Sequence, residues 1–304
     1  MFQIDHSPLK LPLMAMAIYK FSGHETFQCR HFWPKKGFDF LSSGGNFRSE
    51  AATTELGVGK NMVASINYWL RAMGVVNDLG EMTEFGERIY GEDGLDPYLE
   101  DISTLFLLHF NLMRNENYAS IYKLTFEDFR RTRISSDFTE EQLFEFITRT
   151  LKQKEETVSE KTLLNDIKVL IKSYYCDVQH GSKSIEDDLS SVFINLGFIQ
   201  KIEIPGEKIV QYRINFGVQP LLHPLVLLAC IVDVFEESTS ISVEDIQKQV
   251  SDKLLCNAEG TDSKLTYLAD KGFIIYKQDA GRREIQMKKN LNRWELLAKY
   301  YGNI

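Results

Sequence analysis

The segment FSGHETFQCRHFWPKKG, residues 21–37, concentrates side chains that could bind and act on phosphate groups. His24 could serve as a general acid or base, because an imidazole titrates near neutral pH. Glu25 could hold a metal ion or orient that imidazole, and Arg30 could bind a phosphate oxygen. Lys35 and Lys36 could likewise bind phosphate oxygens of DNA. The segment predicts catalysis or phosphate binding, although it lacks a complete catalytic set of its own.

Three aromatic side chains of the same segment could stack on the bases of an opened strand, namely Phe27, Phe32 and Trp33. A structural alternative accounts for the polar residues without chemistry. In that interpretation Glu25 pairs with Arg30, and His24 is a core histidine whose hydrogen bonds are satisfied. Both interpretations stay open at the level of the sequence.

A second candidate set lies in DPYLEDISTLFLLHF, residues 96–110. Asp96, followed by proline, predicts the start of a helix. Glu100 and Asp101 would then lie in its first turns, where the helix dipole favours carboxylates, with His109 further along one face. Helix capping and core packing would explain these residues. The alternative is that Glu100 or Asp101 approaches the histidine or arginine of the first segment, so that the two segments form one catalytic site.

Residues 49–76 predict a helix-turn-helix that could position such a site on a polynucleotide. A short helix over 51–56 would be followed by a glycine turn and by a second helix from about 60 to 73. One face of the second helix carries an apolar stripe for the core: Val63, Ile66, Trp69, Leu70 and Met73.

The opposite face of that second helix carries polar side chains that can donate to phosphates or read base edges: Lys60, Asn61, Ser65, Asn67, Tyr68 and Arg71. The next segment, 75–86, predicts a β-hairpin wing with its turn at 78–80. This wing is acidic and the helix face holds few cations. A protein–protein contact is therefore the alternative to DNA binding by this unit.

Three stretches share one layout, in which a helical run ends at glycine and a β-prone run follows: RAMGVV, NLGFIQ and DKGFII. Glycine is expected just past a helix end, because it accepts the left-handed conformation without strain. The second and third stretches continue into alternating runs with turns at Pro205-Gly206 and Ala280-Gly281. This is how a winged helix ends. The last hairpin carries Arg282 and Arg283, which predict contact with nucleic acid.

These patterns predict an α+β fold, mainly α with small β-hairpins, built from tandem winged-helix or helix-turn-helix units. We expect an N-terminal segment over 1–47 and a winged-helix-like domain over 48–120. A helical middle domain ending in a β-hairpin would cover 121–220, and a C-terminal winged-helix-like domain 221–304. Helix starts are expected at DFTEEQ, 137–142, and at Ser242, which two acidic residues follow in the first turn. A chain of 304 residues is long enough for two or three small domains.

The formal net charge of −8 excludes a protein that coats nucleic acid without specificity, because such proteins are usually basic. Charge is uneven along the chain. Residues 20–48, which end at Arg48, and residues 282–299 are locally basic, whereas 81–101 is acidic. The RRTR segment at 130–133 is expected on a solvated face. Any contact with DNA must therefore come from local patches.

The cysteines are far apart and lack zinc-site spacing, which predicts free thiols in a reducing cytoplasm: Cys29, Cys176, Cys230 and Cys256. The apolar run LPLMAMAI, 11–18, is far shorter than a membrane span. It also lacks the basic region that begins a signal peptide. We expect this run to be a core strand or strap, in a cytoplasmic protein without membrane contact.

Three stretches together resemble a bacterial family long labelled only as a domain of unknown function: SGHETFQCRHFWPKKG, LGVGKNMVASINYWLRAMGVV and DPYLEDISTLFLLHFNL. The resemblance covers residues 20–115 strongly and continues loosely through 185–199 and 212–216. The family is encoded beside cysteine desulfurases, ATP-binding proteins and enzymes similar to phosphoadenosine-phosphosulfate reductase. That neighbourhood implies DNA phosphorothioation, in which sulfur replaces a non-bridging phosphate oxygen.

The second component of the single-stranded, Ssp-type phosphorothioation systems looks like this family and is described as a DNA nickase. The resemblance therefore implies a DNA-nicking endonuclease of a sulfur-modification and phage-defence system. Its implied partners are DNA, a cysteine desulfurase, an ATPase, a reductase-like enzyme and, as a homodimer, a second copy of the chain. A divalent metal, Mg²⁺ or Mn²⁺, is the implied cofactor. The sequence contains no PD-(D/E)xK, HNH or GIY-YIG signature, so a non-enzymatic DNA-binding adaptor is the alternative function.

Overall fold

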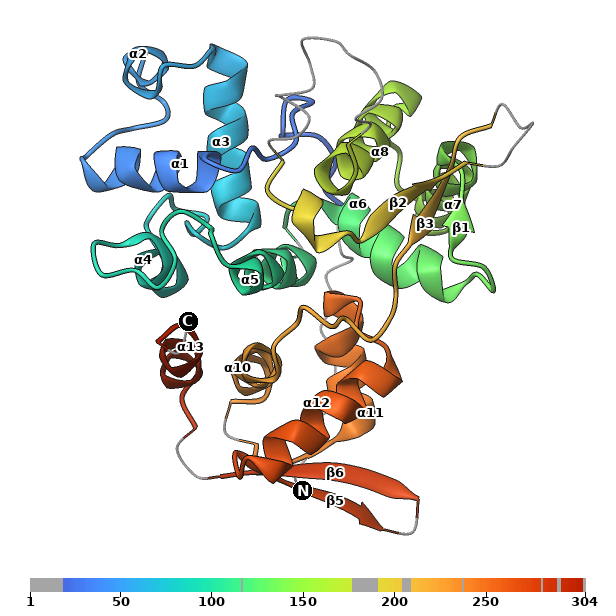
Figure 1. Cartoon of the computed structure of the whole chain (residues 1–304). Coiled ribbons are helices and arrows are strands. Elements are labelled where there is room, and N and C mark those ends of the chain that lie inside the picture. Colours follow the sequence, from blue (N-terminus) through green and yellow to red (C-terminus); the bar gives the residue numbers. More distant parts are fainter. Residues whose placement is uncertain are drawn as a thin grey trace, which may run out of the picture.

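The computed structural model describes residues 19–115, 117–176, 191–203, 209–236, 238–279, 281–288 and 291–302. The predicted strand or strap at 11–18 and most of the two predicted hairpin turns lie outside these residues. The described chain is α+β, as predicted: helices predominate, and two small antiparallel sheets have three strands each (Figure 1). None of the described helices combines the length and the apolar content that a membrane span requires. The three buried cysteines, Cys29, Cys230 and Cys256, are free thiols.

The first part of the chain consists of α1 (Trp33–Ser42), α2 (Ala52–Leu56), α3 (Lys60–Ala72), α4 (Glu84–Tyr90) and α5 (Ile102–Arg114). The predicted glycine turn between two helices is confirmed: α2 ends at Gly57, whose φ of 61° is left-handed. The predicted apolar stripe of α3 is buried as well. Helix α1 crosses α3 closely at Gly37, where an added Cβ would lie 2.6 Å from Leu70.

A short hairpin follows α3, as the sequence predicts. Val76 and Met82 form its antiparallel bridge, and the backbone N–H of Gly80 donates to the carbonyl of Asn77. Thr83 then begins α4, because its side chain accepts the N–H of Gly86.

The middle part contains α6 (Ser120–Lys123), the π-helix η1 (Leu124–Phe129), α7 (Glu140–Gln153), α8 (Glu160–Tyr174) and the short η2 (Ile194–Leu196). Its sheet has the order β1-β3-β2, from β1 (Asp137–Phe138), β2 (Ile199–Ile202) and β3 (Gln211–Ile214). Thr139 and Gln142 form a capping box at the start of α7, where the sequence predicts a helix start.

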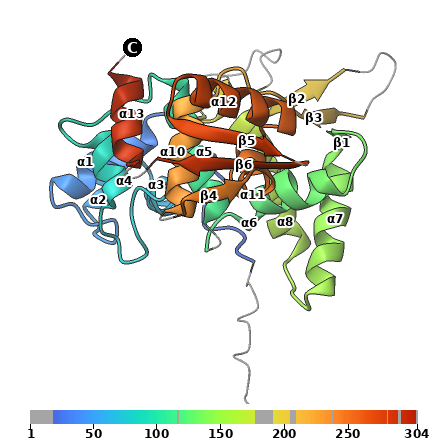
Figure 2. The same cartoon turned by 90° about the horizontal axis from the view of Figure 1, so that it is seen from below.

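The C-terminal part contains α10 (Pro224–Phe235), β4 (Ser240–Ser242), α11 (Val243–Gln249), η3 (Ser251–Leu254), α12 (Ala258–Asp270), β5 (Ile274–Asp279), β6 (Arg282–Met287) and α13 (Arg293–Tyr301). The sheet order β4-β6-β5 has the same topology as the middle sheet, because in each sheet the first strand pairs with the last strand. Ser242 caps α11, as predicted. The hairpin of β5 and β6 lies at the end of the molecule opposite to α2 and α3 (Figures 1 and 2).

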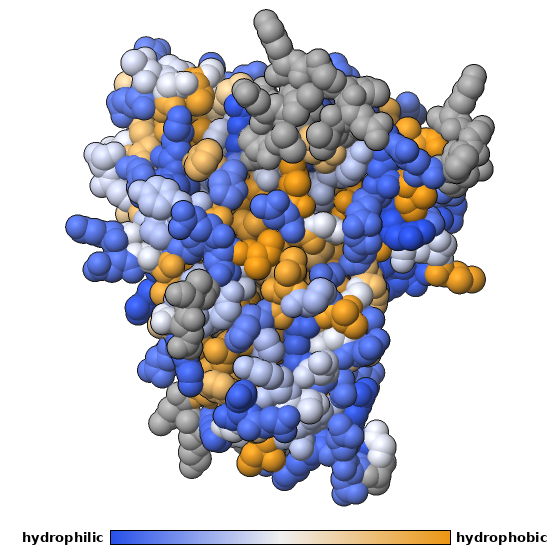
Figure 3. Space-filling view, viewed as in Figure 1, coloured by the Kyte–Doolittle hydropathy of each residue, from blue (hydrophilic) through white to orange (hydrophobic). Residues whose placement is uncertain are grey.

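One continuous apolar core runs through all three parts and includes Trp69, Phe126 and Ile231. On the face drawn in Figure 3, hydrophobic side chains gather in the middle and hydrophilic ones toward the edges. The helix α13 returns to the first part, where the hydroxyl of Tyr300 donates to Asp101 over 3.0 Å.

An ionic network joins η1 to η3. Asp252 accepts from Arg131 over 2.8 Å and lies 3.3 Å from Arg130, and Lys253 pairs with Glu127 over 2.8 Å. The predicted position of the RRTR segment on a solvated face is therefore wrong for Arg130, whose side chain is 12% exposed. The cause is the acidic partner Asp252, which lies far along the chain and is invisible to local sequence patterns.

Candidate functional site

The GHET loop, residues 22–26, has a strained backbone. Four of its residues have positive φ: Ser22 at 67°, Gly23 at 88°, Glu25 at 48° and Thr26 at 65°. Only glycine adopts this conformation without steric cost, and strain of this kind is concentrated at functional sites. A Cβ at Gly23 would lie 2.7 Å from the ring of Tyr68, so the loop is also pressed against α3. The tip of the loop presents the exposed carboxylate of Glu25.

His24 is 2% exposed and holds this loop in place. Its Nε2 lies 3.2 Å from Oδ1 of Asp166 on α8, and its Nδ1 accepts the N–H of Thr26 over 3.2 Å. The ring stacks on Trp69, with an interplanar angle of 16°. Asp166 also accepts the N–H of Ser22 over 2.9 Å. Since both ring nitrogens face protein groups, His24 in this geometry positions the loop.

Asp166 is a site residue that the sequence analysis missed. It is buried on the apolar face of α8, beside Leu163, Ile167 and Leu170. The available signal was a carboxylate at a core position of an amphipathic helix, because a buried acid must have a partner.

Each of the basic side chains after the loop contacts a group close to it in the structure. The guanidinium of Arg30 lies 5.4 Å from the ring centre of Trp33. Lys35 forms an ion pair with Asp39, and Lys36 donates to the carbonyl of Leu56 over 2.9 Å.

The three predicted stacking rings differ in exposure. Phe32 is 66% exposed, Phe27 is half-buried and Trp33 is 4% exposed. The prediction that Trp33 could stack on a base is wrong, because the ring belongs to the core beneath the start of α1.

The second candidate segment forms a polar turn before α5. Asp101, not Asp96, caps this helix, accepting the N–H of Ser103 over 2.7 Å. Asp96 is buried and accepts the N–H groups of Glu100 and Asp101, at 2.8 and 3.1 Å. The predicted helix start at Asp96 is therefore wrong, since its carboxylate closes the turn.

The alternative in which Glu100 or Asp101 approaches His24 is also wrong, because the carboxylate beside His24 is that of Asp166. Asp101 is bound by Ser103 and by the hydroxyl of Tyr300, and Glu100 is exposed. The two segments meet elsewhere: Nε2 of His31 donates to the carbonyl of Tyr98 over 3.1 Å.

The polar face of α3 is mixed. Lys60 and Asn61 are exposed, whereas Ser65 is fully buried, so its predicted place on the exposed face is wrong. Ser65 lies one turn before Trp69 and hence on the core side. Arg71 donates to Asn67 over 3.2 Å and to the carbonyl of Asp78 over 2.6 Å. Arg71 thus connects α3 to the hairpin that follows it.

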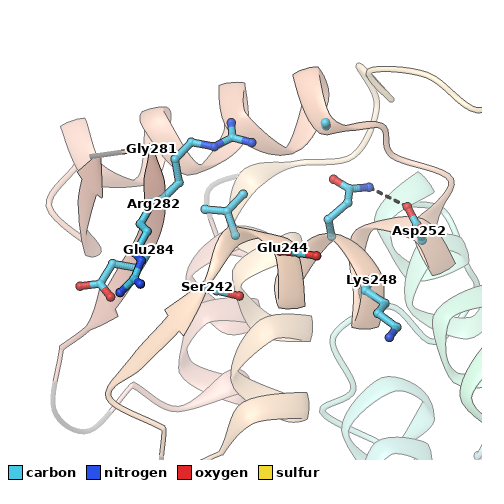
Figure 4. A pocket seen from close by; sticks show the side chains of 11 residues that line it. Ser242, Glu244, Lys248, Asp252, Gly281, Arg282 and Glu284 are labelled. Atoms are coloured by element: carbon cyan, nitrogen blue, oxygen red, sulfur yellow. Dashed lines mark hydrogen bonds between the residues drawn. The ribbon is translucent and has the colours of Figure 1, made fainter. Parts of the chain in front are cut away.

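The remaining predicted DNA contacts are exposed but spread out. Arg48 lies in the loop between α1 and α2. Arg282 and Arg283 lie on β6, and Arg283 pairs with Asp262 of α12 over 3.1 Å. A cavity of about 580 Å³ is lined by residues of α11 and β6, with acids and bases in its wall (Figure 4). Because β6 and α3 lie at opposite ends of the molecule, these residues do not form one compact surface.

Residues 21–301 match the family model described as "Protein of unknown function (DUF4007)". The chain belongs to this family.

Two solved structures share the fold of this DUF4007 protein. A crystal structure of magnesium ion-bound SspB is 24% identical, with a TM-score of 0.78, over 95% of this chain and 90% of that one. An SspB crystal structure is also 24% identical, with a TM-score of 0.77, over 93% of this chain and 88% of that one. The comparison with curated proteins found no match.

The metal ion of that relative raises the question of a metal site in this DUF4007 chain. Within the described ranges, no three or more His, Cys, Asp or Glu side chains gather in a way that could hold a metal ion. The described residues therefore do not form a preassembled cage. Mg²⁺ commonly takes one or two carboxylates and completes its shell with water and substrate phosphates.

Proposed function

We propose that this DUF4007 chain is a component of a bacterial DNA phosphorothioation system that binds DNA and nicks one strand. The observation that carries the proposal is the fold, which corresponds to that of SspB along nearly the whole chain. Its partners would be DNA and the sulfur-transfer machinery: a cysteine desulfurase, an ATPase and a reductase-like enzyme.

The connectivity of the C-terminal part supports DNA binding. Helix, strand, two helices and a hairpin follow one another, with the first strand paired to the last, which is the order of a winged helix. In this proposal α12 and the β5–β6 hairpin approach the duplex, and Arg282 contacts phosphate. The first part, with α2, α3 and the hairpin at 75–83, would be a second unit of this kind.

The strained GHET loop supports nicking. His24 and Asp166 fix the backbone, so that the exposed Glu25 is carried at a constant place. Arg30 follows in the chain, where its guanidinium lies 5.4 Å from the ring centre of Trp33. In the proposal Glu25 meets the attacking water or a substrate-borne Mg²⁺ or Mn²⁺, and Arg30 contacts the phosphate. Because the loop is held before DNA arrives, little ordering is required when the substrate binds.

A plasmid assay tests the proposal. Supercoiled plasmid is incubated with the protein and Mg²⁺, Mn²⁺ or EDTA, and the relaxed circle is measured. Nicking should require the metal and fall at least tenfold in Glu25→Gln and in Arg30→Ala. Glu50→Gln, an exposed acid beside α2, is the matched control and should nick normally. If no relaxed circle forms under any condition, and Glu25→Gln supports normal sulfur modification in cells, nicking by this chain is excluded.

A non-enzymatic adaptor is the second candidate, because both nitrogens of His24 face protein groups. The adaptor would choose the DNA site and recruit the sulfur-transfer enzymes. It predicts salt-sensitive DNA binding, with affinity falling roughly tenfold or more over a fourfold rise in salt, and no relaxed circle. Binding that is absent or insensitive to salt would count against both candidates.

A further inference from the structure

Two large aromatic side chains project into solvent beside each other. Phe32 is 66% exposed and Tyr98 is 60% exposed. They come from separate segments that are joined by the hydrogen bond between His31 and the Tyr98 carbonyl. The ammonium group of Lys35 lies 5.8 Å from the ring centre of Tyr98. Exposed aromatic rings held by such contacts are typical of binding surfaces.

A cavity of about 450 Å³ lies between these rings, α1 and the end of α2. That volume is within the range of sites for small ligands. Its floor is apolar, because Phe40 and Leu56 are both buried there. An apolar group in the cavity would therefore contact both this floor and the two rings.

The rim of the cavity carries charges of both signs. Lys36 is exposed and uses one of its three N–H donors for the carbonyl of Leu56. Glu55 and Asp39 supply carboxylate oxygens, and Asp39 is paired with Lys35. The combination offers a cation for a phosphate, stacking surfaces for a base and acceptors for an exocyclic amino group.

We propose that this cavity receives one unpaired nucleotide of the DNA, with its base against Phe32 and Tyr98 and its phosphate at Lys36. The inference rests on the proposed function and adds that the chain holds its DNA locally unpaired. A base cannot reach such a cavity while it is stacked in a duplex, so it must come from a single strand or be extruded. A purely apolar peptide would offer no partner to Glu55 or to the remaining N–H donors of Lys36.

The test uses two probes of the same sequence, one single-stranded and one duplex, with 2-aminopurine at one position of the single strand. Binding is followed by anisotropy and stacking by quenching of the 2-aminopurine fluorescence. Phe32→Ala and Tyr98→Leu should each weaken single-strand binding roughly tenfold and abolish much of the quenching. Phe32→Trp and Tyr98→Phe keep a ring and should retain both signals. Ile134→Ala, at an exposed apolar position in the loop before β1, is the matched control.

The outcomes separate this inference from the proposed function. If the wild type binds duplex and nicks plasmid, but Phe32→Ala and Tyr98→Leu bind and quench the single strand like the wild type, the nucleotide site is excluded while the proposed function stands. If these variants keep every DNA signal and lose only a protein partner, the cavity is a protein contact and the inference is overturned. A wild type that binds neither probe would contradict the proposed function itself.

Discussion

Nε2 of His24 lies 3.2 Å from Oδ1 of Asp166, and both side chains are 2% exposed. The contact joins the GHET loop to α8 across more than a hundred residues of chain. Asp166 also accepts the N–H of Ser22, so one carboxylate fixes the loop at two points. The strained conformation of the loop therefore depends on the middle part of the molecule.

Replacement of Asp166 by asparagine should loosen the loop. The amide keeps the size of the side chain but removes the negative charge that faces the imidazole and the Ser22 N–H. A buried polar group that loses its partner costs about 1–3 kcal/mol. Urea unfolding should show that loss and, if the chain nicks DNA as proposed, nicking should fall with it. Asp39→Asn, at an exposed ion pair on α1, is the control and should change the free energy of unfolding by less than about 1 kcal/mol. Equal stability of the two variants would contradict this role of Asp166.

His109 predicts an acid-sensitive stability. Its Nε2 donates to the carbonyl of Lys253 over 2.8 Å, so in the neutral ring Nδ1 accepts from the Tyr174 hydroxyl over 2.7 Å. Burial lowers the pKa of His109 from 6.5 to about 3. Between pH 3 and pH 6.5, His109 therefore binds a proton in the unfolded chain but not in the folded chain. The stabilisation is complete above pH 6.5 and is lost as pH falls toward 3, at up to about 1.4 kcal/mol per pH unit.

The pH dependence of His109 can be isolated with two variants. In His109→Gln the free energy of unfolding should lose this part of its slope between pH 6.5 and 4. Tyr174→Phe removes one hydrogen bond but leaves the titrating ring, so its curve should be lower and keep the slope. Chemical unfolding at a series of pH values measures both. A His109→Gln curve parallel to that of the wild type would refute the assignment.

Lys60 and Arg71, both predicted DNA contacts of α3, should behave differently. Lys60 is exposed at the first turn of the helix. If α3 meets DNA, Lys60→Ala should weaken binding severalfold, lower the salt slope by about one and leave the melting temperature unchanged. Arg71→Ala should lower the melting temperature, because its guanidinium fastens the hairpin at Asp78. Calorimetry and binding at several salt concentrations separate the two. A loss of stability in Lys60→Ala would show that the helix face is structural.

Local patterns in the sequence predicted the elements of this fold well. The turn at Gly57, the buried stripe of α3 and the caps at Ser242 and Thr139 depend on residues within one or two helical turns of each other. Glycine conformation and helical periodicity act at that range. The existence and type of these elements could therefore be predicted.

The candidate site depends on contacts over long distances in the sequence, which local patterns do not contain. Asp166 reaches His24, and Tyr98 reaches the start of α1. The burial of Ser65 shows the same limit on a smaller scale: a serine is compatible with either side of a helix, and tertiary packing decides. Residue types predicted chemistry near the GHET loop, which stays a prediction, whereas the contact partners of these residues could be identified only from the fold.

The two ends of the molecule should contribute to DNA affinity independently. Arg282 lies on the exposed hairpin of β6, far from α3 (Figure 1). Arg282→Ala should weaken duplex binding severalfold and lower the salt slope by about one, as expected for one phosphate contact. Lys154→Ala, an exposed lysine after α7, is the matched control and should bind normally.

Distant sites without shared partners contribute additively to the free energy of binding. In the double variant with Arg282→Ala and Lys60→Ala, the fold-losses of affinity for a long duplex should therefore multiply. On a duplex too short to span both ends of the molecule, each substitution should reduce the affinity less than it does on the long duplex. If Arg282→Ala or Lys60→Ala binds the long duplex as tightly as the wild type, the end of the protein that carries that residue does not contact DNA.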